Sequence, residues 1–339
     1  MACNPPGAER GQAAWRSFYT VSLWVSGTAL ARNWLSCVAQ STIKEMEMQQ
    51  VEERVVYSVA RQGWLDGLAQ AIQRAVNGLF AGSPAGRRVK DFLNGVWLAH
   101  PLHPTVTDVP VGAWTTSLML DGVESVTGRN VQPATTTAIG VGIGGAVISA
   151  MSGVADWSST HNDQRRVGLI HAALNSVALT LYGVSLWRRL SGRPSGAKRL
   201  STLGWLSMVA GAYLGGELTY RLGTQVDRNA WVKGPMDFTP AMPDAELLPD
   251  RPTRRVVNGI PVMLVRRNGV VFAMSDICSH EGCSLSEGRI ENGAIVCPCH
   301  GSTYRLEDGS VIHGPSPYAQ PQYQVRVHNG QIEIRTAQR

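Results

Sequence analysis

The chain has 339 residues with a formal net charge of +6, and 44% of its residues are hydrophobic. This length is enough for more than one domain. The positive charge is spread over many loops, so no nucleic-acid partner is expected; contact with anionic membrane lipid explains the charge as well.

Residues 1–54 are a poorly defined N-terminal extension. Residues 1–45 show no basic start followed by an apolar core and a small-residue cleavage site, so no signal peptide is expected. Met46 and Met48 are candidates for the true start of translation. Nothing indicates a role for Cys3 or Cys37.

Residues 55–82 predict an amphipathic helix. Apolar residues recur there at helical spacing, with polar residues on the other faces. Such a helix would lie on a membrane surface or pack against neighbouring helices. The apolar positions are Leu65, Leu68, Ile72, Val76 and Leu79.

Residues 92–223 predict a transmembrane domain of four helices. Three stretches in this segment contain no charged residue, and each approaches the roughly 20 apolar residues that cross a bilayer. A fourth candidate, residues 105–127, is interrupted by Asp108 and Asp121. The alternative is a soluble helical bundle with buried helices. The three uncharged stretches are residues 131–155, 167–187 and 200–216.

Two glycine pairs in this segment indicate close packing of helices. Gly140 and Gly144 form the first pair, and Gly211 and Gly215 form the second. Small residues four positions apart let membrane helices approach each other closely.

Four histidines occur in or near the expected helices, and only His171 lies inside an uncharged stretch. His103 and His171 are candidates for a haem b or quinone site, since ionisable groups within a bilayer are often functional. The alternatives are a proline-capped turn for His103 and a hydrogen-bonded core position for His171. The acidic groups Asp108, Asp121 and Glu217 are candidates for proton relay or for bridging helices.

Residues 246–339 predict a small β domain, joined to the helices by a linker at residues 224–245. Asn258-Gly259 is a strong hairpin signal between two strands within residues 255–265. Short strands at this spacing indicate a sandwich or barrel. Further strands are expected at residues 270–274, 294–296, 322–327 and 331–335.

Two short motifs in the β domain carry cysteine and histidine. The first places Cys278 two positions before His280, and the second places Cys297 three positions before His300. This is the ligand set of a Rieske [2Fe–2S] cluster, in which two thiolates hold one iron and two imidazoles hold the other. The alternative is a zinc site, although zinc fingers usually pair Cys with Cys and His with His.

The segment from residue 246 to the end resembles the Rieske domain family, and its motifs are similar to those of the cytochrome bc-complex subtype. The resemblance implies a disulfide between Cys283 and Cys299, and two free buried thiols are the alternative. It therefore implies a high-potential cluster braced by a disulfide, with exposed histidine edges.

The same resemblance implies two cluster-tuning residues. The Ser302 hydroxyl would hydrogen-bond a bridging sulfide, and the Tyr304 hydroxyl would reach the sulfur of Cys278. Donors to sulfur stabilise the reduced cluster and raise its reduction potential. Residues 314–317 resemble the family's proline loop, which covers the cluster on a third side.

Residues 92–223 resemble a bacterial four-helix membrane domain, known as domain of unknown function 2231. The resemblance rests on three short motifs and implies architecture only, because that family has no settled activity. The motifs are His100-Pro-Leu-His103-Pro104, Asp108-Val-Pro110 and Gly215-Gly216.

The expected fold class is therefore multidomain α and β, with an N-terminal four-helix transmembrane bundle and a C-terminal all-β Rieske [2Fe–2S] domain. The expected function is electron transfer between a quinol or reductase donor and a cytochrome or oxidase acceptor. The alternative is a quinol oxidoreductase whose bundle binds haem b or quinone. A complete oxygenase is not expected, since it needs a large catalytic domain and only 39 residues follow His300.

The expected location is the cell membrane, with several crossings. Residues 188–199 form the densest basic loop, which indicates a cytoplasmic position. Four crossings then place the Rieske domain on the outer face, where a disulfide is also more stable. Basic residues also flank the opposite side of the bundle, so the charge rule is close to balanced.

Overall fold

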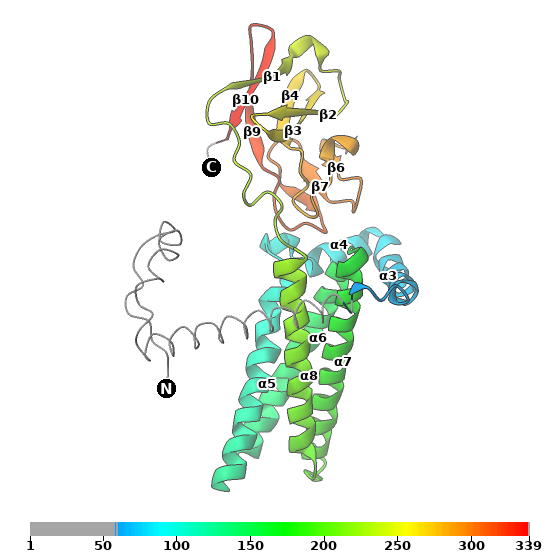
Figure 1. Ribbon diagram of the computed structural model, residues 1–339, viewed down its shortest axis with the longest axis vertical. Coiled ribbons are helices and arrows are strands. Elements are labelled where there is room, and N and C mark those ends of the chain that lie inside the picture. The colour runs from blue at the N-terminus through cyan, green and yellow to red at the C-terminus, as the bar shows by residue number, and fades with distance from the viewer. Residues whose placement is uncertain (1–57, 59, 338–339) are drawn as a thin grey trace, which may run out of the picture. The chain divides into compact units, whose positions relative to one another are not determined.

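The computed structural model describes residue 58 and residues 60–337. The N-terminal extension expected over residues 1–54 lies outside the described residues, and so do both candidate start methionines and two of the cysteines, Cys3 and Cys37. From residue 60 onward the chain forms one compact unit, in which helices precede two β-sheets (Figure 1).

Four long helices form a bundle, in which α5 packs mainly on α6 and α7 packs mainly on α8. Two shorter helices and a 3-10 turn at Val96–Leu98 precede the bundle, and a π turn at Glu217–Arg221 follows it. The helices are α3 (Leu65–Ala81), α4 (Pro84–Leu93), α5 (Leu102–Thr127), α6 (Gln132–Trp157), α7 (Asn162–Leu190) and α8 (Ala197–Gly216).

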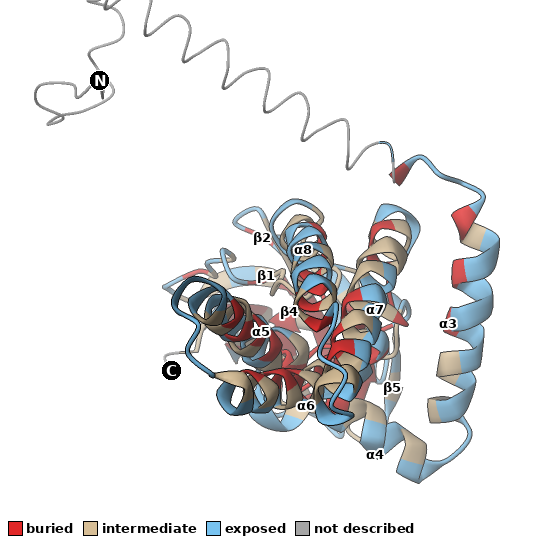
Figure 2. Ribbon diagram, turned by 90° about the horizontal axis from the view of Figure 1, so that it is seen from below, coloured by how far each residue is buried: buried red, intermediate tan, exposed pale blue. Residues whose placement is uncertain are grey.

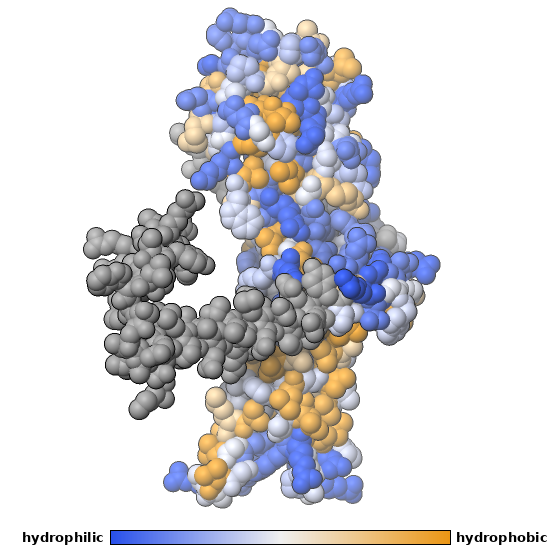
Figure 3. All heavy atoms as spheres, in the orientation of Figure 1, coloured by the Kyte–Doolittle hydropathy of each residue, from blue (hydrophilic) through white to orange (hydrophobic). Residues whose placement is uncertain are grey.

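The bundle buries small polar side chains and exposes apolar ones. Ser117, Ser152 and Ser185 are fully buried, whereas Met119 and Met151 are more than half exposed. The buried faces of α5 to α8 turn toward one another (Figure 2), and apolar residues gather on the outside of the bundle (Figure 3). This distribution suits a hydrocarbon surrounding, where small residues mediate helix packing. By length and composition, α6 and α7 are each able to cross a membrane.

The glycines at the helix contacts differ in part from those expected. An added Cβ at Gly140 or Gly144 would meet nothing, so the expectation of close packing there was wrong. Gly142 and Gly145 take that role, because an added Cβ would lie 2.3 Å from the Trp114 ring or 2.7 Å from Val109, respectively. The helical repeat places positions 142 and 145 on one face, one helical turn apart.

Asp121 bridges helices. Its carboxylate accepts a 2.6 Å hydrogen bond from Arg189, and both side chains are almost fully buried. Glu217 lies 3.6 Å from Arg221, one turn further along the chain, and Asp108 is exposed. A buried ion pair of this kind links α5 to α7 across the bundle, since either partner alone would be an uncompensated charge.

The amphipathic helix is α3, which begins at Leu65 and packs against the bundle; residues 55–57 and 59 of the expected range lie outside the described residues. Asp66 accepts hydrogen bonds from Arg165 and Arg166 at the start of α7. The Gln73 amide donates to the carbonyls of Trp157 and Thr160 at 2.8 and 3.0 Å. These contacts cover the connection between α6 and α7.

The β region contains two antiparallel sheets. A six-stranded sheet has the order β1-β10-β9-β4-β3-β2, and a four-stranded sheet has the order β5-β6-β7-β8. The strands are β1 (Thr239–Pro243), β2 (Thr253–Val257), β3 (Ile260–Arg267), β4 (Val270–Ser275), β5 (Arg289–Glu291), β6 (Ala294–Val296), β7 (Thr303–Arg305), β8 (Val311–His313), β9 (Gln322–His328) and β10 (Gln331–Thr336).

The expected strands and hairpin are all present, and β1, β5, β7 and β8 are additions. Asn258 and Gly259 have φ values of 50° and 81°, which the two-residue hairpin turn between β2 and β3 requires. Strand β1 lies inside the segment expected as a linker. It pairs with β10 and buries Met242 in the core of the six-stranded sheet, so the ordered β domain begins earlier than residue 246.

Candidate metal centre

The first motif forms a closed loop after β4. An isolated bridge joins Ile277 to Ser284, and inside it the Cys278 amide donates to the Cys283 carbonyl at 2.8 Å. The Gly282 amide donates back to the Cys278 carbonyl at 2.9 Å. Gly282 has a φ of 79°, in the left-handed region that glycine adopts most readily.

The second motif repeats this design between β6 and β7. The Cys297 amide donates to the Ser302 carbonyl at 2.8 Å, and the Gly301 amide donates to the Cys297 carbonyl at 3.1 Å. Gly301 has the same φ of 79° as Gly282. Two equivalent tight loops therefore present one cysteine and one histidine each.

The two loops bring their histidines together. The Nδ1 atoms of His280 and His300 lie 3.3 Å apart, and the ring planes are nearly perpendicular at 82°. His280 is only 4% exposed and His300 is half-buried, with its Nε2 beside His161, so the expectation of exposed histidine edges was wrong for His280 and holds only in part for His300. The cause is the segment before β1, which lies along the first loop: the Arg228 amide donates to the Ser279 carbonyl at 3.2 Å.

The two cysteines are buried thiols in contact with each other. A hydrogen bond from Cys278 holds the pKa of the Cys297 thiol at about 7, while contact with Cys297 and burial raise the pKa of Cys278. Burial, followed by nearby positive charge, lowers the pKa of His280 to about 3 and that of His300 to about 4. Both imidazoles are therefore neutral at neutral pH, which is the form that binds metal.

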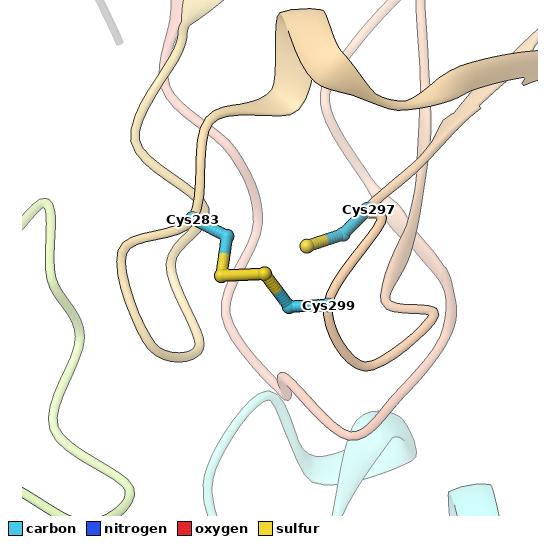
Figure 4. Close-up of side chains that lie close together, drawn as sticks. All are labelled: Cys283, Cys297 and Cys299. Carbon is cyan, nitrogen blue, oxygen red and sulfur yellow. A yellow bond between two sulfur atoms is a disulfide. The ribbon is translucent and has the colours of Figure 1, made fainter.

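Cys283 and Cys299 form a disulfide that joins the two loops, as the resemblance implied. Figure 4 shows this bond beside the Cys297 sulfur. The three sulfur atoms lie within 4.8 Å of one another, but the bonded pair has no thiolate to offer a metal. The free thiols of Cys278 and Cys297 remain as sulfur donors.

Tyr304 lies where the sequence placed it. Its hydroxyl is 3.3 Å from the Cys278 sulfur and 2.9 Å from the Ser279 hydroxyl. Burial raises the pKa of Tyr304 well above its ordinary value, so the group stays protonated and able to donate. Ser279 and Ser316, whose hydroxyls lie 3.0 Å apart, extend this buried network. Both lie within the motifs, but the sequence analysis assigned no role to either.

Ser302 is fully buried beside the second loop. Its hydroxyl oxygen accepts a 3.1 Å hydrogen bond from the Ser316 amide in the proline loop. Because the oxygen accepts in this contact, the hydroxyl proton is not used there. A bond from that proton to a bridging sulfide is a proposal that this geometry permits.

Helical residues that the motifs did not indicate also reach this region. His161, at the start of α7, has its Nδ1 3.1 Å from Nε2 of His300. The Asp91 carboxylate accepts from His313 Nδ1 at 2.8 Å and from the Gly314 amide at 2.9 Å. A cavity of about 720 Å³ lies beside these groups and is lined by His300 and Lys90, among others. These helical residues lie far from the cluster motifs in the sequence, so no local sequence pattern could have indicated that they reach the site.

The donor set fits an iron–sulfur cluster. Two ligands on one tetrahedral ion, each about 2.1 Å from the metal, lie about 3.4 Å apart. The 3.3 Å between the Nδ1 atoms of His280 and His300 matches this separation. Cys278 and Cys297 lie together on the buried side of the same loops, so nitrogen and sulfur donors are segregated as a two-iron cluster requires.

Two family descriptions match separate parts of the chain. "Rieske [2Fe-2S] domain" matches residues 237–324, and "Predicted membrane protein (DUF2231)" matches residues 99–228. The first match begins just before β1, in agreement with the ordered domain.

Curated relatives match the β domain. The anthranilate 1,2-dioxygenase ferredoxin subunit of Burkholderia cepacia is 34% identical over 89 residues, covering 26% of this chain and 82% of the relative. The cytochrome b6-f complex iron-sulfur subunit of Chlorobaculum tepidum is 38% identical, covering 24% and 43%. The cytochrome bc1 complex Rieske iron-sulfur subunit of Streptomyces lividans is 42% identical, covering 17% and 35%. This chain thus spans most of the ferredoxin subunit but under half of each cytochrome-complex subunit.

Proposed function

Because this chain belongs to the Rieske [2Fe-2S] domain family, we propose that it is a membrane-anchored carrier of single electrons. When bound, the [2Fe–2S] cluster supplies reversible one-electron chemistry. We assign Cys278 and Cys297 to one iron and His280 and His300 to the other. The convergence of the two loops on a pair of Nδ1 atoms 3.3 Å apart carries this assignment.

The protein groups around the cluster favour a high potential. Tyr304 is held protonated against the Cys278 sulfur, and Ser302 is placed to donate from the second loop. Donors to sulfur stabilise the reduced state, which carries one more negative charge. The proposed donor is a quinol or a reductase, and the proposed acceptor is a cytochrome or an oxidase. The cavity beside His300 supports access from outside the β domain.

We assign all four bundle helices to the membrane, with the β domain on the outer face. The apolar outside of the bundle supports the first assignment, and the disulfide of Cys283 and Cys299 supports the second. A C-terminal alkaline phosphatase fusion is expected to be active in cells. If instead only a C-terminal reporter that works in the cytosol were active, the β domain would lie on the cytoplasmic face and the assigned orientation would be wrong.

The cluster assignment is tested on the full chain purified in mild detergent. We expect a Rieske-type EPR signal after reduction and about two irons per chain. His300→Cys is expected to lower the reduction potential by several hundred millivolts, roughly the gap between Rieske and all-cysteine clusters. Stoichiometric zinc without an EPR signal, or an unchanged potential in the variant, would contradict the assignment.

A further inference from the structure

A second pair of histidines meets inside the bundle, away from the β domain. His103 is on α5 and His171 is on α7, and their ring centroids lie 6.1 Å apart with the planes at 83°. Each of these helices packs on α6 and α8, so the two rings meet across the diagonal of the bundle. Ionisable groups at such a depth are costly in a membrane and commonly serve a function.

Hydrogen bonds fix the tautomer of both rings. His103 Nδ1 lies 2.8 Å from the Ser149 carbonyl, and His171 Nδ1 lies 2.7 Å from the Gly211 carbonyl. A carbonyl only accepts, so each Nδ1 carries the proton and each Nε2 keeps its lone pair. A histidine that binds a metal almost always donates its other ring N–H in this way.

The same local arrangement occurs in both halves of the bundle. In each half the carbonyl that accepts from the histidine is followed four residues later by a glycine: Gly153 after Ser149, and Gly215 after Gly211. An added Cβ at Gly153 would lie 2.8 Å from His103 Nδ1, and one at Gly215 would lie 3.1 Å from the His171 ring. The glycines therefore allow each ring to reach its carbonyl.

The separation of the rings fits two ligands on opposite sides of one iron. Iron–nitrogen bonds of about 2 Å and ring radii of about 1.1 Å place two such centroids about 6 Å apart. The observed value for His103 and His171 is 6.1 Å. Aromatic contacts alone also span this range, but they do not require both Nε2 atoms to be deprotonated. Facing helices of a four-helix bundle commonly supply cofactor ligands from their core positions.

We propose that His103 and His171 are the two axial ligands of a b-type haem in the membrane bundle. Two imidazole ligands leave no open position on the iron, so the site suits electron transfer and excludes binding of oxygen or substrate to the metal. Gly153 on α6 and Gly215 on α8 carry no side chain at the points where the helices contact the two imidazoles, so each ring can lie against its neighbouring helix.

The proposed haem lies within the same chain as the cluster. His171 follows His161 by ten residues on α7, about 15 Å at 1.5 Å per residue. His161 in turn contacts His300. Transfer between the two centres rests on the proposed cluster function, and it moves one electron from the reduced cluster to ferric haem without forming or breaking a bond.

The experiment is an optical spectrum of the full chain, expressed with a haem precursor and purified in mild detergent. We expect a low-spin b-type spectrum in the reduced protein with about one haem per chain. His103→Ala and His171→Ala should each lower haem content at least about tenfold. His100→Ala is the matched control and should keep it, because His100 lies outside the pair and bonds locally to Pro101 and Thr105.

The Rieske EPR signal of each preparation reports folding independently of haem. His103→Met should retain haem with a shifted potential, because a thioether replaces one imidazole. Gly215→Val should lose haem while it keeps the EPR signal, since the added side chain meets the His171 ring. An intact EPR signal without haem in the wild type, or a wild-type haem content in both alanine variants, would overturn the haem site and leave the cluster assignment unaffected. Haem without an EPR signal would do the reverse.

Discussion

Two pairs of histidines meet in this molecule, and they present opposite nitrogens. In the β domain, His280 and His300 face each other through Nδ1, and Nε2 of His300 points to the helices. In the bundle, His103 and His171 bind backbone carbonyls through Nδ1, and Nε2 of His171 lies 3.4 Å from the Asn175 amide nitrogen. In the bundle pair, a backbone carbonyl therefore determines which ring nitrogen carries the proton.

The difference shows how a loop and a helix each position a ligand. A tight loop with a left-handed glycine folds around its own donors, so a cysteine and a histidine two or three positions apart suffice. In a helix the backbone carbonyls are already used by the helix's own hydrogen bonds. A carbonyl from a neighbouring helix is therefore needed to orient the histidine ring. The two sites should therefore be separable by mutation.

The largest expected effect is the complete loss of one site with retention of the other. Cys297→Ala removes a thiolate ligand, so the Rieske EPR signal should disappear while the haem absorption stays unchanged. Val327→Ala, at an exposed position on β9, is the control and should change neither. A common loss of both signals would mean that the two sites depend on each other for folding.

The disulfide should stabilise only the β domain. Cys283 and Cys299 are 16 residues apart, and closing a loop of that size stabilises a fold by about 3 kcal/mol. The Cys283→Ser, Cys299→Ser double variant should therefore unfold in its β domain at lower denaturant concentration, as followed by loss of the cluster absorption. Helical circular dichroism of the bundle should persist. Equal destabilisation of both parts would contradict this separation.

Tyr304→Phe should change the cluster potential and not the haem potential. Loss of one buried hydrogen bond of about 1 kcal/mol corresponds to a decrease on the order of 50 mV for a one-electron couple. Redox titration of both centres gives the measurement. Tyr318→Phe is a matched control, because its hydroxyl donates to the Gln225 carbonyl and not to sulfur. A comparable decrease in the control would remove the specific role of Tyr304.

The smallest expected effect concerns the outer helix of the bundle. Hydrogen bonds from Arg166 and Arg165 lower the pKa of Asp66 to about 2 from its ordinary value of 3.8. A lowered pKa means that the stabilisation is complete above about pH 4 and is lost as the pH falls toward 2. The protection of the α3 amides against hydrogen exchange, relative to their intrinsic exchange rate, should therefore fall in that window. In the Asp66→Asn variant, the α3 amides should be less protected at neutral pH, and their protection should no longer depend on pH in this window. An unchanged protection profile would show that the contacts of Asp66 with the two arginines do not hold α3 in place.

The sequence predicted the cluster region in detail because its information is local. Four ligand positions, two turning glycines and Tyr304 all lie within 27 residues, from 278 to 304. The hairpin at Asn258-Gly259 and the strand positions followed from turn chemistry and short apolar runs in the same way. The ligand assignment remains a proposal, since it awaits spectroscopy.

The architecture of the bundle was predicted, but its contacts only in part: His103 meets His171, and Gly211 and Gly215 lie at close helix contacts, as expected. Uncharged stretches indicate helices without telling which face meets a neighbour, so Gly140 and Gly144 were chosen where Gly142 and Gly145 pack. Strand β1 was missed because two prolines, at positions 240 and 243, weaken its strand signal, although an edge strand tolerates them. The contact of His161 with His300 joins residues 139 positions apart and has no sequence signature.

The Asp91 carboxylate has a consequence for kinetics. It accepts hydrogen bonds from both His313 and the amide of Gly314, so the last turn of α4 is bonded directly to the proline loop beside the cluster site. For the proposed electron carrier, these contacts predict a β domain held in one position against the helices rather than one that rotates on a linker. The carrier's turnover should therefore depend on how fast partners arrive, and not on the viscosity that slows the rotation of a tethered head.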